Sequence, residues 1–199
     1  KPDMKGSAET LKGLRVLGPT STMEQWIAAS YFSQFGLTAG ADYEYLNMDR
    51  AAAAQAIIGG EGDVFVATDV DYARMMEENG FVKVADCMEA TGTSFNNGFL
   101  ARKDVLDAEG GAATLEALKA AWDEAAGKIN ADGDAYRELL ASKANLSEDL
   151  AKTYKVSEYP TCQLPTQEQV DNVLNWMKKK GYLADGISYD AASGEFSGK

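Results

Sequence analysis

Residues 14–23 read Leu-Arg-Val-Leu-Gly-Pro-Thr-Ser-Thr-Met, a short apolar run, a Gly-Pro break and three hydroxyl residues. The apolar run predicts a strand over Leu14–Leu17, and the spacing of the later apolar residues predicts a helix with one buried face. Those later residues are Met23, Trp26, Ile27, Tyr31 and Phe35. Ser21 and Glu24 have the spacing of a capping box at the start of this helix.

A strand that leads into a helix brings backbone N–H donors and the positive end of the helix dipole to one point. Such a point suits an oxyanion or a small polar molecule. The simpler alternative is that the hydroxyl residues Thr20, Ser21 and Thr22 only cap the helix.

The alternation of strand and helix continues to residue 85. Further strands are expected over Tyr43–Met48, Asp63–Ala67 and Phe81–Ala85. Helices are expected between them, over Arg50–Ile58 and Val70–Asn79. Alternation with short connections predicts an α/β lobe with a mostly parallel sheet and flanking helices.

The pattern changes after this lobe, which we assign to residues 1–95. Residues 96–110 form a crossover segment, residues 111–184 a helical C-terminal part, and residues 185–199 a flexible tail rich in Gly, Ser and Asp. In the helical part the apolar spacing and start signals predict four helices. They cover about Ala112–Asn130, Asp134–Ala144, Ser147–Tyr154 and Thr166–Lys180.

In parallel sheets of this kind, ligands lie at the carboxyl ends of the strands. Polar side chains follow the predicted strands there, at Thr20, Ser21, Thr22, Asn47, Thr68 and Asp69. Asp69 also suits a helix cap, and for Asp49 we prefer the role of a cap.

Composition excludes several classes of function. A net charge of −12 leaves no basic patch for nucleic acid, so no nucleic-acid partner is expected. The chain has no histidine, which removes Ser-His-Asp and Cys-His nucleophiles and the commonest zinc ligand. We therefore expect no catalytic residues, no metal, no cofactor and no enzymatic activity.

The two cysteines, Cys87 and Cys162, leave two alternatives open. They suit one disulfide in an exported protein or two buried thiols in a cytosolic one. The chain opens on Lys1 without an initiator Met and shows no signal peptide, which indicates a start that is processed, as by removal of a signal peptide, or trimmed.

Short motifs resemble the second lobe of type II periplasmic solute-binding proteins of ABC transporters. They are Leu11–Val16, Gly18–Thr22, Ala56–Val64 and Phe99–Asp104, and the resemblance spans roughly Glu9 to Leu183. The most similar subgroup serves nitrate, sulfonates, taurine and thiamine pyrimidine precursors.

The resemblance implies a solute-binding component of an uptake transporter, located in the periplasm or as a cell-surface lipoprotein. Its partners would be a sulfonate, nitrate or pyrimidine-like solute and the membrane subunits of the transporter. Ser21 and Thr22 correspond to hydroxyls that open the family's helix, and Asn96 and Asn97 lie in the segment between lobes, where they contact ligand or act as a hinge.

Two departures from the family pattern stand out. Family members carry a further N-terminal lobe segment ahead of the Leu-Lys-Gly motif, so the resemblance implies a shortened or one-lobe relative. After the third strand this chain has Thr68-Asp69-Val70 where the family often has an aromatic or acidic residue and then Pro.

Two other interpretations compete with transport. A cytosolic ligand-sensing regulatory domain has the same lobe architecture, but nothing basic precedes Lys1. A pyrimidine synthase on a related lobe resembles histidine-dependent chemistry, which the lack of histidine disfavours.

Overall fold

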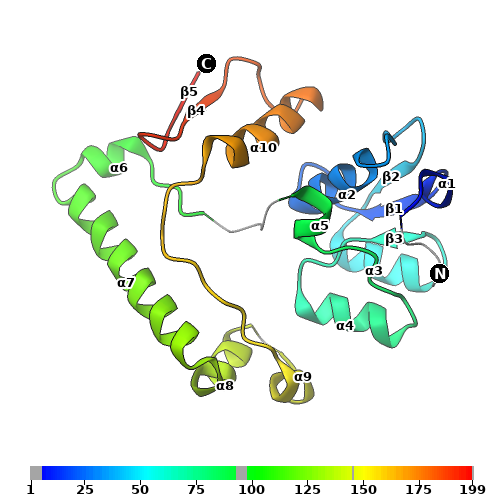
Figure 1. Cartoon of the computed structure of the whole chain (residues 1–199), viewed down its shortest axis with the longest axis horizontal. Coiled ribbons are helices and arrows are strands. Elements are labelled where there is room, and N and C mark those ends of the chain that lie inside the picture. The colour runs from blue at the N-terminus through cyan, green and yellow to red at the C-terminus, as the bar shows by residue number, and fades with distance from the viewer. Residues whose placement is uncertain (1–5, 93–97, 145, 199) are drawn as a thin grey trace. The chain divides into compact units, whose positions relative to one another are not determined.

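The computed structural model describes residues 6–92, 98–144 and 146–198 (Figure 1). The chain divides into two compact units. Unit 1 comprises Lys1–Asn96 and Pro165–Lys199, and unit 2 comprises Asn97–Leu164. This division differs from the predicted domain boundaries, because the C-terminal helix and tail group with the α/β lobe.

Unit 1 is built on a three-stranded parallel sheet with the order β2-β1-β3. The strands are β1 (Arg15–Gly18), β2 (Glu44–Asn47) and β3 (Val64–Phe65). Val16 in the central strand pairs with Tyr45 on one side and Val64 on the other. The predicted α/β class with a parallel sheet and flanking helices is confirmed.

Neighbouring residues of β1 face opposite sides of the sheet, as the alternation of side chains along a strand requires. Val16 belongs to a core with Phe32 of α2 (Met23–Ser33), whereas Leu17 packs with Ile57 of α3 (Arg50–Ile58). All four of these side chains are at most 1% exposed. The two helices therefore cover opposite faces of the sheet, and both meet it through its central strand.

The predicted fourth strand, Phe81–Ala85, is wrong, because these residues have no regular structure. α4 (Val70–Glu78) ends in a turn in which the backbone N–H of Phe81 donates to the carbonyl oxygen of Met76. Val82 is 47% exposed, so the apolar run does not enter the sheet. Asp86 then opens α5 (Cys87–Thr91) with a capping box to Glu89. At the other end of the lobe, α1 (Ala8–Leu11) precedes the sheet.

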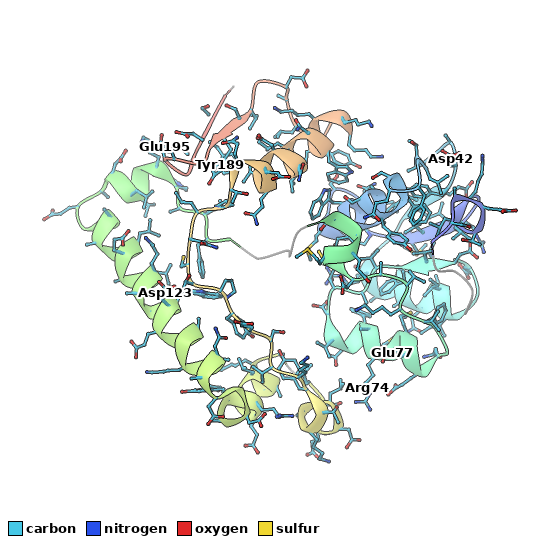
Figure 2. The ribbon with its side chains drawn as sticks, viewed as in Figure 1. Asp42, Arg74, Glu77, Asp123, Tyr189 and Glu195 are labelled. Atoms are coloured by element: carbon cyan, nitrogen blue, oxygen red, sulfur yellow. The ribbon has the colours of Figure 1, made fainter. Side chains whose placement is uncertain are left out.

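The C-terminal part of unit 1 is α10 (Gln167–Lys179) and a hairpin of β4 (Ser188–Asp190) and β5 (Glu195–Ser197). Thr166 and Gln169 form a capping box at the start of α10. The hairpin occupies residues for which the sequence predicts a fraying tail. It is anchored by Tyr189, which is buried, lies against Phe196 and donates its hydroxyl to the carbonyl of Pro165 (Figure 2).

Unit 2 is helical, as predicted, with one addition. It contains α7 (Gly111–Ala131), α8 (Gly133–Lys143) and α9 (Glu148–Thr153), and the unpredicted α6 (Lys103–Asp107) within the expected crossover segment. An extended stretch after α9 is fixed to α7 by side chains that bind its backbone. The Trp122 indole donates to the carbonyl of Pro160 at 2.8 Å, and Asp123 accepts from the N–H of Cys162 at 2.6 Å.

Among the described residues, no helix combines the length and apolar character that crossing a membrane requires.

Candidate functional site

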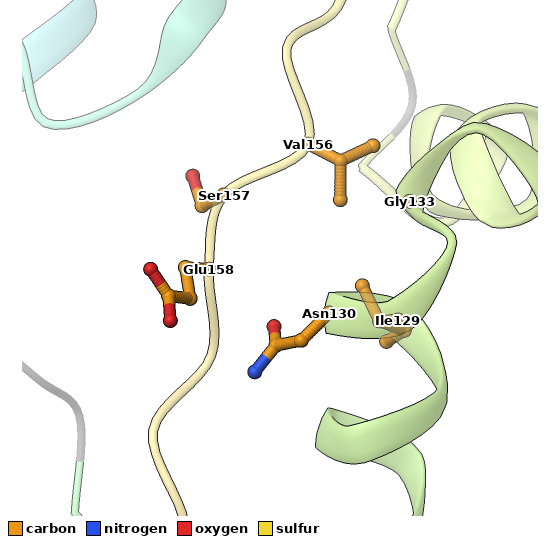
Figure 3. A pocket seen from close by; sticks show the side chains of 6 residues that line it. All are labelled: Ile129, Asn130, Gly133, Val156, Ser157 and Glu158. Carbon is orange, nitrogen blue, oxygen red and sulfur yellow. The ribbon is translucent and has the colours of Figure 1, made fainter.

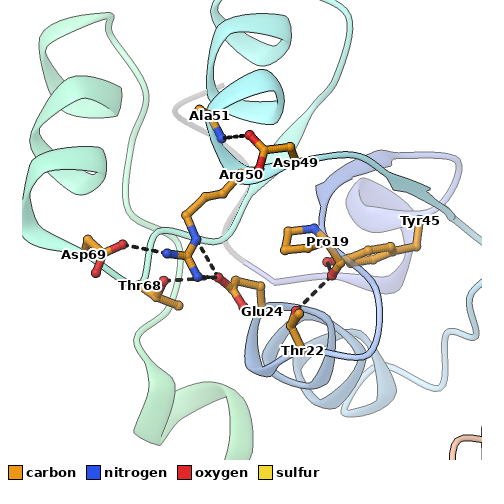
Figure 4. Close-up of polar contacts among 9 residues, drawn as sticks. All are labelled: Pro19, Thr22, Glu24, Tyr45, Asp49, Arg50, Ala51, Thr68 and Asp69. Atoms are coloured by element: carbon orange, nitrogen blue, oxygen red, sulfur yellow. Dashed lines mark hydrogen bonds and ion pairs between the residues drawn. The ribbon is translucent and has the colours of Figure 1, made fainter.

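Polar side chains from the ends of all three parallel strands meet at the start of α2. We call this set the strand-end site, and Figure 4 shows five of its members, Thr22, Glu24, Arg50, Thr68 and Asp69. The site consists of Thr20, Ser21, Thr22, Glu24, Asn47, Arg50, Thr68 and Asp69.

The loop that joins β1 to α2 is held by hydrogen bonds from several directions. Two hydroxyls converge on the carbonyl oxygen of Pro19, that of Thr22 at 2.9 Å and that of Tyr45 at 3.0 Å. The backbone N–H of Thr20 donates to Oδ1 of Asn47 at 3.0 Å, which ties the loop to the end of β2. Ser21 has a φ of 59°, in the left-handed region that non-glycine residues adopt rarely. These hydrogen bonds therefore hold the loop in one conformation, with Ser21 exposed at its tip.

The predicted capping box of Ser21 and Glu24 is wrong. Thr22 is the N-cap residue, and its side chain makes no capping hydrogen bond to the first turn. The backbone N–H of Ser21 donates to Oε1 of Gln25 instead, at 2.9 Å. The first turn of α2 is therefore not capped by the residue in the N-cap position.

Glu24 is instead the buried centre of an ion-pair network. Its side chain is 3% exposed and accepts from Nε of Arg50 at 2.7 Å, from Nη2 of Arg50 and from the hydroxyl of Thr68 at 3.2 Å. Burial acts to raise the pKa of Glu24, but hydrogen bonds from its own backbone, Thr22 and Arg50 outweigh it. The net pKa therefore lies below the ordinary value, and Glu24 is ionised at neutral pH.

Arg50 extends the network from Glu24 to the end of β3. Its Nη1 donates to Oδ2 of Asp69 at 3.0 Å. Asp69 occupies the N-cap position of α4 but makes no side-chain capping bond, because its carboxylate is turned toward Arg50. Asp49, by contrast, accepts from the N–H groups of Ala51 and Ala52, which confirms its predicted role as a cap of α3.

The buried side chain of Gln25 connects the strand-end site to the C-terminal part of unit 1. Its Oε1 also accepts from the hydroxyl of Tyr182 at 3.0 Å. The Tyr182 ring packs edge to face against Trp176, with 5.7 Å between ring centroids. The indole Nε1 of Trp176 is buried and has no hydrogen-bond partner among the described residues. Aromatic surface therefore borders the start of α2.

The structure brings together six of the eight predicted ligand-binding residues. These are Thr20, Ser21, Thr22, Asn47, Thr68 and Asp69. Asn96 and Asn97 lie outside the described residues. Sequence reasoning missed the residues that organise the site, Glu24, Arg50 and Gln25. Their partners are distant in sequence, and a charged residue in a first helical turn gives no signal of which distant residue it binds.

A hollow lies in unit 2, between the end of α7 and the extended stretch that follows α9 (Figure 3). It has a volume of about 380 Å³ and is lined by Ile129, Asn130, Gly133, Val156, Ser157 and Glu158. The Asn130 amide is already engaged with the backbone of Tyr159, as donor at 2.7 Å and as acceptor at 2.9 Å. The hollow therefore offers a single charged group, Glu158, and no convergent set of donors.

Within the described parts of the chain, no group of three or more Cys, Asp and Glu side chains is arranged to hold a metal ion. Cys87 in unit 1 and Cys162 in unit 2 are both thiols.

Comparison with known proteins gives a match at the level of fold. No protein-family model matches the chain, and a comparison with curated proteins finds no match. Among solved structures, the periplasmic aliphatic sulphonate-binding protein SsuA from Escherichia coli aligns over 91% of the chain at 18% identity, with a TM-score of 0.70. The alkanesulfonate-binding protein SsuA from Xanthomonas axonopodis pv. citri, bound to MOPS, aligns over 92% at 15% identity, with a TM-score of 0.68.

The chain spans about 62–63% of the length of these two proteins. At such low identity the likeness shows that the chain shares a fold with these two proteins.

Proposed function

We propose that this chain binds a small polar solute at the strand-end site, as the solute-binding component of an ABC-type uptake transporter. The solute is held by hydrogen bonds and is not chemically changed. The partners are the solute and the membrane subunits of the transporter, and the location is the periplasm or the cell surface, with a lipid anchor as one form of attachment. Sulfonate, nitrate and pyrimidine-like compounds are the classes that the sequence resemblance suggests.

The observation that carries this proposal is the convergence of polar groups from three strand ends on one helix start. The carboxyl edge of a parallel sheet is where α/β folds place their ligands. The fold shared with two sulfonate-binding proteins supports a binding role over a catalytic one. The absence of histidine from the sequence agrees with binding without chemistry.

The Ser21 and Thr22 hydroxyls are the proposed direct contacts, because both lie where the first turn of α2 is left without a side-chain cap. Ser21 is exposed, and its left-handed backbone holds it at the tip of the loop. Thr20, Asn47, Thr68 and Asp69 complete the proposed binding set.

A thermal-shift screen of the full chain with sulfonates, nitrate, amino acids and pyrimidines tests the proposal. Calorimetry on any compound that raises the melting temperature then compares the wild type with the double variant Ser21→Ala, Thr22→Ala. We expect the affinity of the double variant to fall about tenfold or more, as loss of one to two hydrogen bonds predicts.

Ser33→Ala is the matched control, because the Ser33 hydroxyl also donates to a backbone carbonyl, that of Ser30, but at the far end of the same helix. It should leave affinity unchanged. Equal affinity of the double variant and the wild type would reduce Ser21 and Thr22 to structural roles.

A further inference from the structure

We infer that the strand-end site selects a neutral or positively charged polar group, such as an amine or a protonated heterocycle, and rejects sulfonate and nitrate. This inference rests on the proposed function, because it concerns the charge of the solute held at the same site. It separates this chain from the two sulfonate-binding proteins whose fold it shares.

Each of the three helices that begin at the strand ends already has a carboxylate of its own. Glu24 lies in the first turn of α2, Asp49 caps α3, and Asp69 stands at the N-cap position of α4. A helix N-terminus attracts anions because it carries about half of an elementary positive charge. Here a carboxylate side chain with a full negative charge lies at each of the three helix starts and offsets this positive charge.

The guanidinium of Arg50 in this network is also already paired with carboxylates of the protein. Three hydrogen bonds from it go to carboxylates, two of them to Glu24 and one to Asp69. To bind Arg50, an anion from solution would have to displace one of two carboxylates that the fold already holds in place beside it. Arg50 therefore adds hydrogen-bond donors to the site but no unpaired positive charge.

The charge balance follows from these groups. Three carboxylates face one guanidinium and three helix starts of about half a charge each, which leaves the site slightly negative. An excess of positive charge, which would favour a strong-acid anion, is therefore lacking among these groups. The Lys178–Lys180 run lies at the end of α10, where its charges complement the negative end of that helix.

Asp69 is an exposed carboxylate of the site. It is 54% exposed and lies on the outer side of Arg50, away from the buried Glu24 (Figure 4). Because Arg50 divides its single positive charge between Glu24 and Asp69, Asp69 keeps part of its negative charge, which attracts an amine and repels a sulfonate. Aromatic rings also border the start of α2, at Tyr182 and Trp176, and such rings suit a flat heterocycle or a cation better than a compact anion.

Calorimetry on the full chain with probes matched in size tests this inference. One pair is benzylamine and phenylmethanesulfonate, and the other is 2-aminoethanol and 2-hydroxyethanesulfonate, with sodium nitrate as a fifth probe. We expect the amine to bind about tenfold or more tightly than its sulfonate partner in at least one pair, and nitrate not to bind. Asp69→Asn should reduce this preference at least several-fold, whereas Asp71→Asn, an exposed carboxylate in the first turn of the same helix, should leave it intact.

The two ideas fail in different ways. A sulfonate that binds as tightly as its amine partner, or a preference that Asp69→Asn does not alter, overturns the charge selectivity and leaves the proposed binding role standing. If neither these probes nor the solutes of the thermal-shift screen bind, the proposed function itself is overturned, and the selectivity with it.

Discussion

At the scale of single residues, Glu24 determines the structure of the strand-end site. A buried carboxylate is stable only where hydrogen bonds and an opposite charge replace its lost hydration. Arg50 and Thr68 supply these from two other segments, so the charge of Glu24 fixes the start of α2 against the ends of β2 and β3. This role follows from the three-dimensional arrangement, since Arg50 is 26 positions away in the sequence.

Glu24→Gln should destabilise unit 1 by about 1–3 kcal/mol, because it leaves the Arg50 guanidinium without its buried partner. The figure is toward the low end for a buried pair, since Arg50 is 39% exposed. Urea denaturation followed by circular dichroism measures the change. Glu78→Gln is the control, because it breaks the exposed pair of Glu78 and Arg74 and should cost less than about 0.5 kcal/mol. Equal losses in the two variants would contradict the assigned role of Glu24.

The lowered pKa of Glu24 predicts a pH dependence of stability. The folded state holds its proton less tightly than the unfolded chain does, in which the pKa is about 4.3. The stabilisation by ionised Glu24 is therefore complete above that value and is lost as the pH falls below it toward the lower folded pKa. Unfolding measured from pH 6 to about pH 3 should show a steeper loss in the wild type than in Glu24→Gln. Parallel curves would mean that Glu24 titrates as it does in the unfolded chain.

At the scale of elements, local signals predicted where most helices begin, and distant contacts decided the rest. Asp49 acts as the predicted cap of α3, Thr166 caps α10 at the predicted helix start, and the central strand β1 forms at the apolar run that predicts it. The segment Phe81–Ala85 has the same apolar character but lies outside the sheet, because its first residue completes the turn that ends α4. The sequence shows that the first loop carries hydroxyl side chains, but it does not show which groups they bind. The hydroxyl of Thr22 donates to the carbonyl of Pro19, and this contact depends on the backbone geometry of the loop.

The approach of the β3 segment to β1 requires glycine at position 62. A Cβ added there would lie 2.5 Å from Cγ and 2.6 Å from Cδ1 of Leu17, which is 1% exposed. Gly62→Ala should therefore destabilise the chain by about 1–3 kcal/mol through overpacking. Thermal unfolding followed by circular dichroism provides the measurement.

Gly59→Ala serves as the control for this prediction. Gly59 has a φ of −72°, and an added Cβ would come no closer than 3.4 Å to the carbonyl oxygen of Ala56. It should change stability by less than about 0.5 kcal/mol. A similar loss in both variants would show that the Leu17 side chain gives way and that the contact is not limiting.

At the scale of the whole molecule, the two units differ in how much apolar surface they bury. Unit 1 contains large buried side chains in two clusters on opposite faces of its sheet. In the described part of unit 2, the buried hydrophobic residues are Ala126 and Ala141, and Leu118 of α7 is 45% exposed. Because hydrophobic stabilisation scales with the apolar area removed from water, unit 2 should be the less stable of the two.

Hydrogen exchange followed by mass spectrometry checks this difference. Amides of β1 and α3 should exchange last, and amides in the middle of α7 should exchange through openings that cost at least about 2 kcal/mol less. Uniform protection across both units would show that the chain unfolds as one cooperative block. It would also mean that unit 2 gains stability from contacts other than its own buried side chains.

The link between Gln25 and Tyr182 bears on the order in which the protein is assembled during translation. Strand β1 and helix α2 leave the ribosome before Tyr182, because the hydroxyl that completes the hydrogen bonding of Gln25 follows it by 157 positions. The nascent lobe can therefore collapse around its sheet before the first turn of α2 acquires its last partner. The proposed binding of a solute would then have to wait until Tyr182 has been synthesised and has reached Gln25.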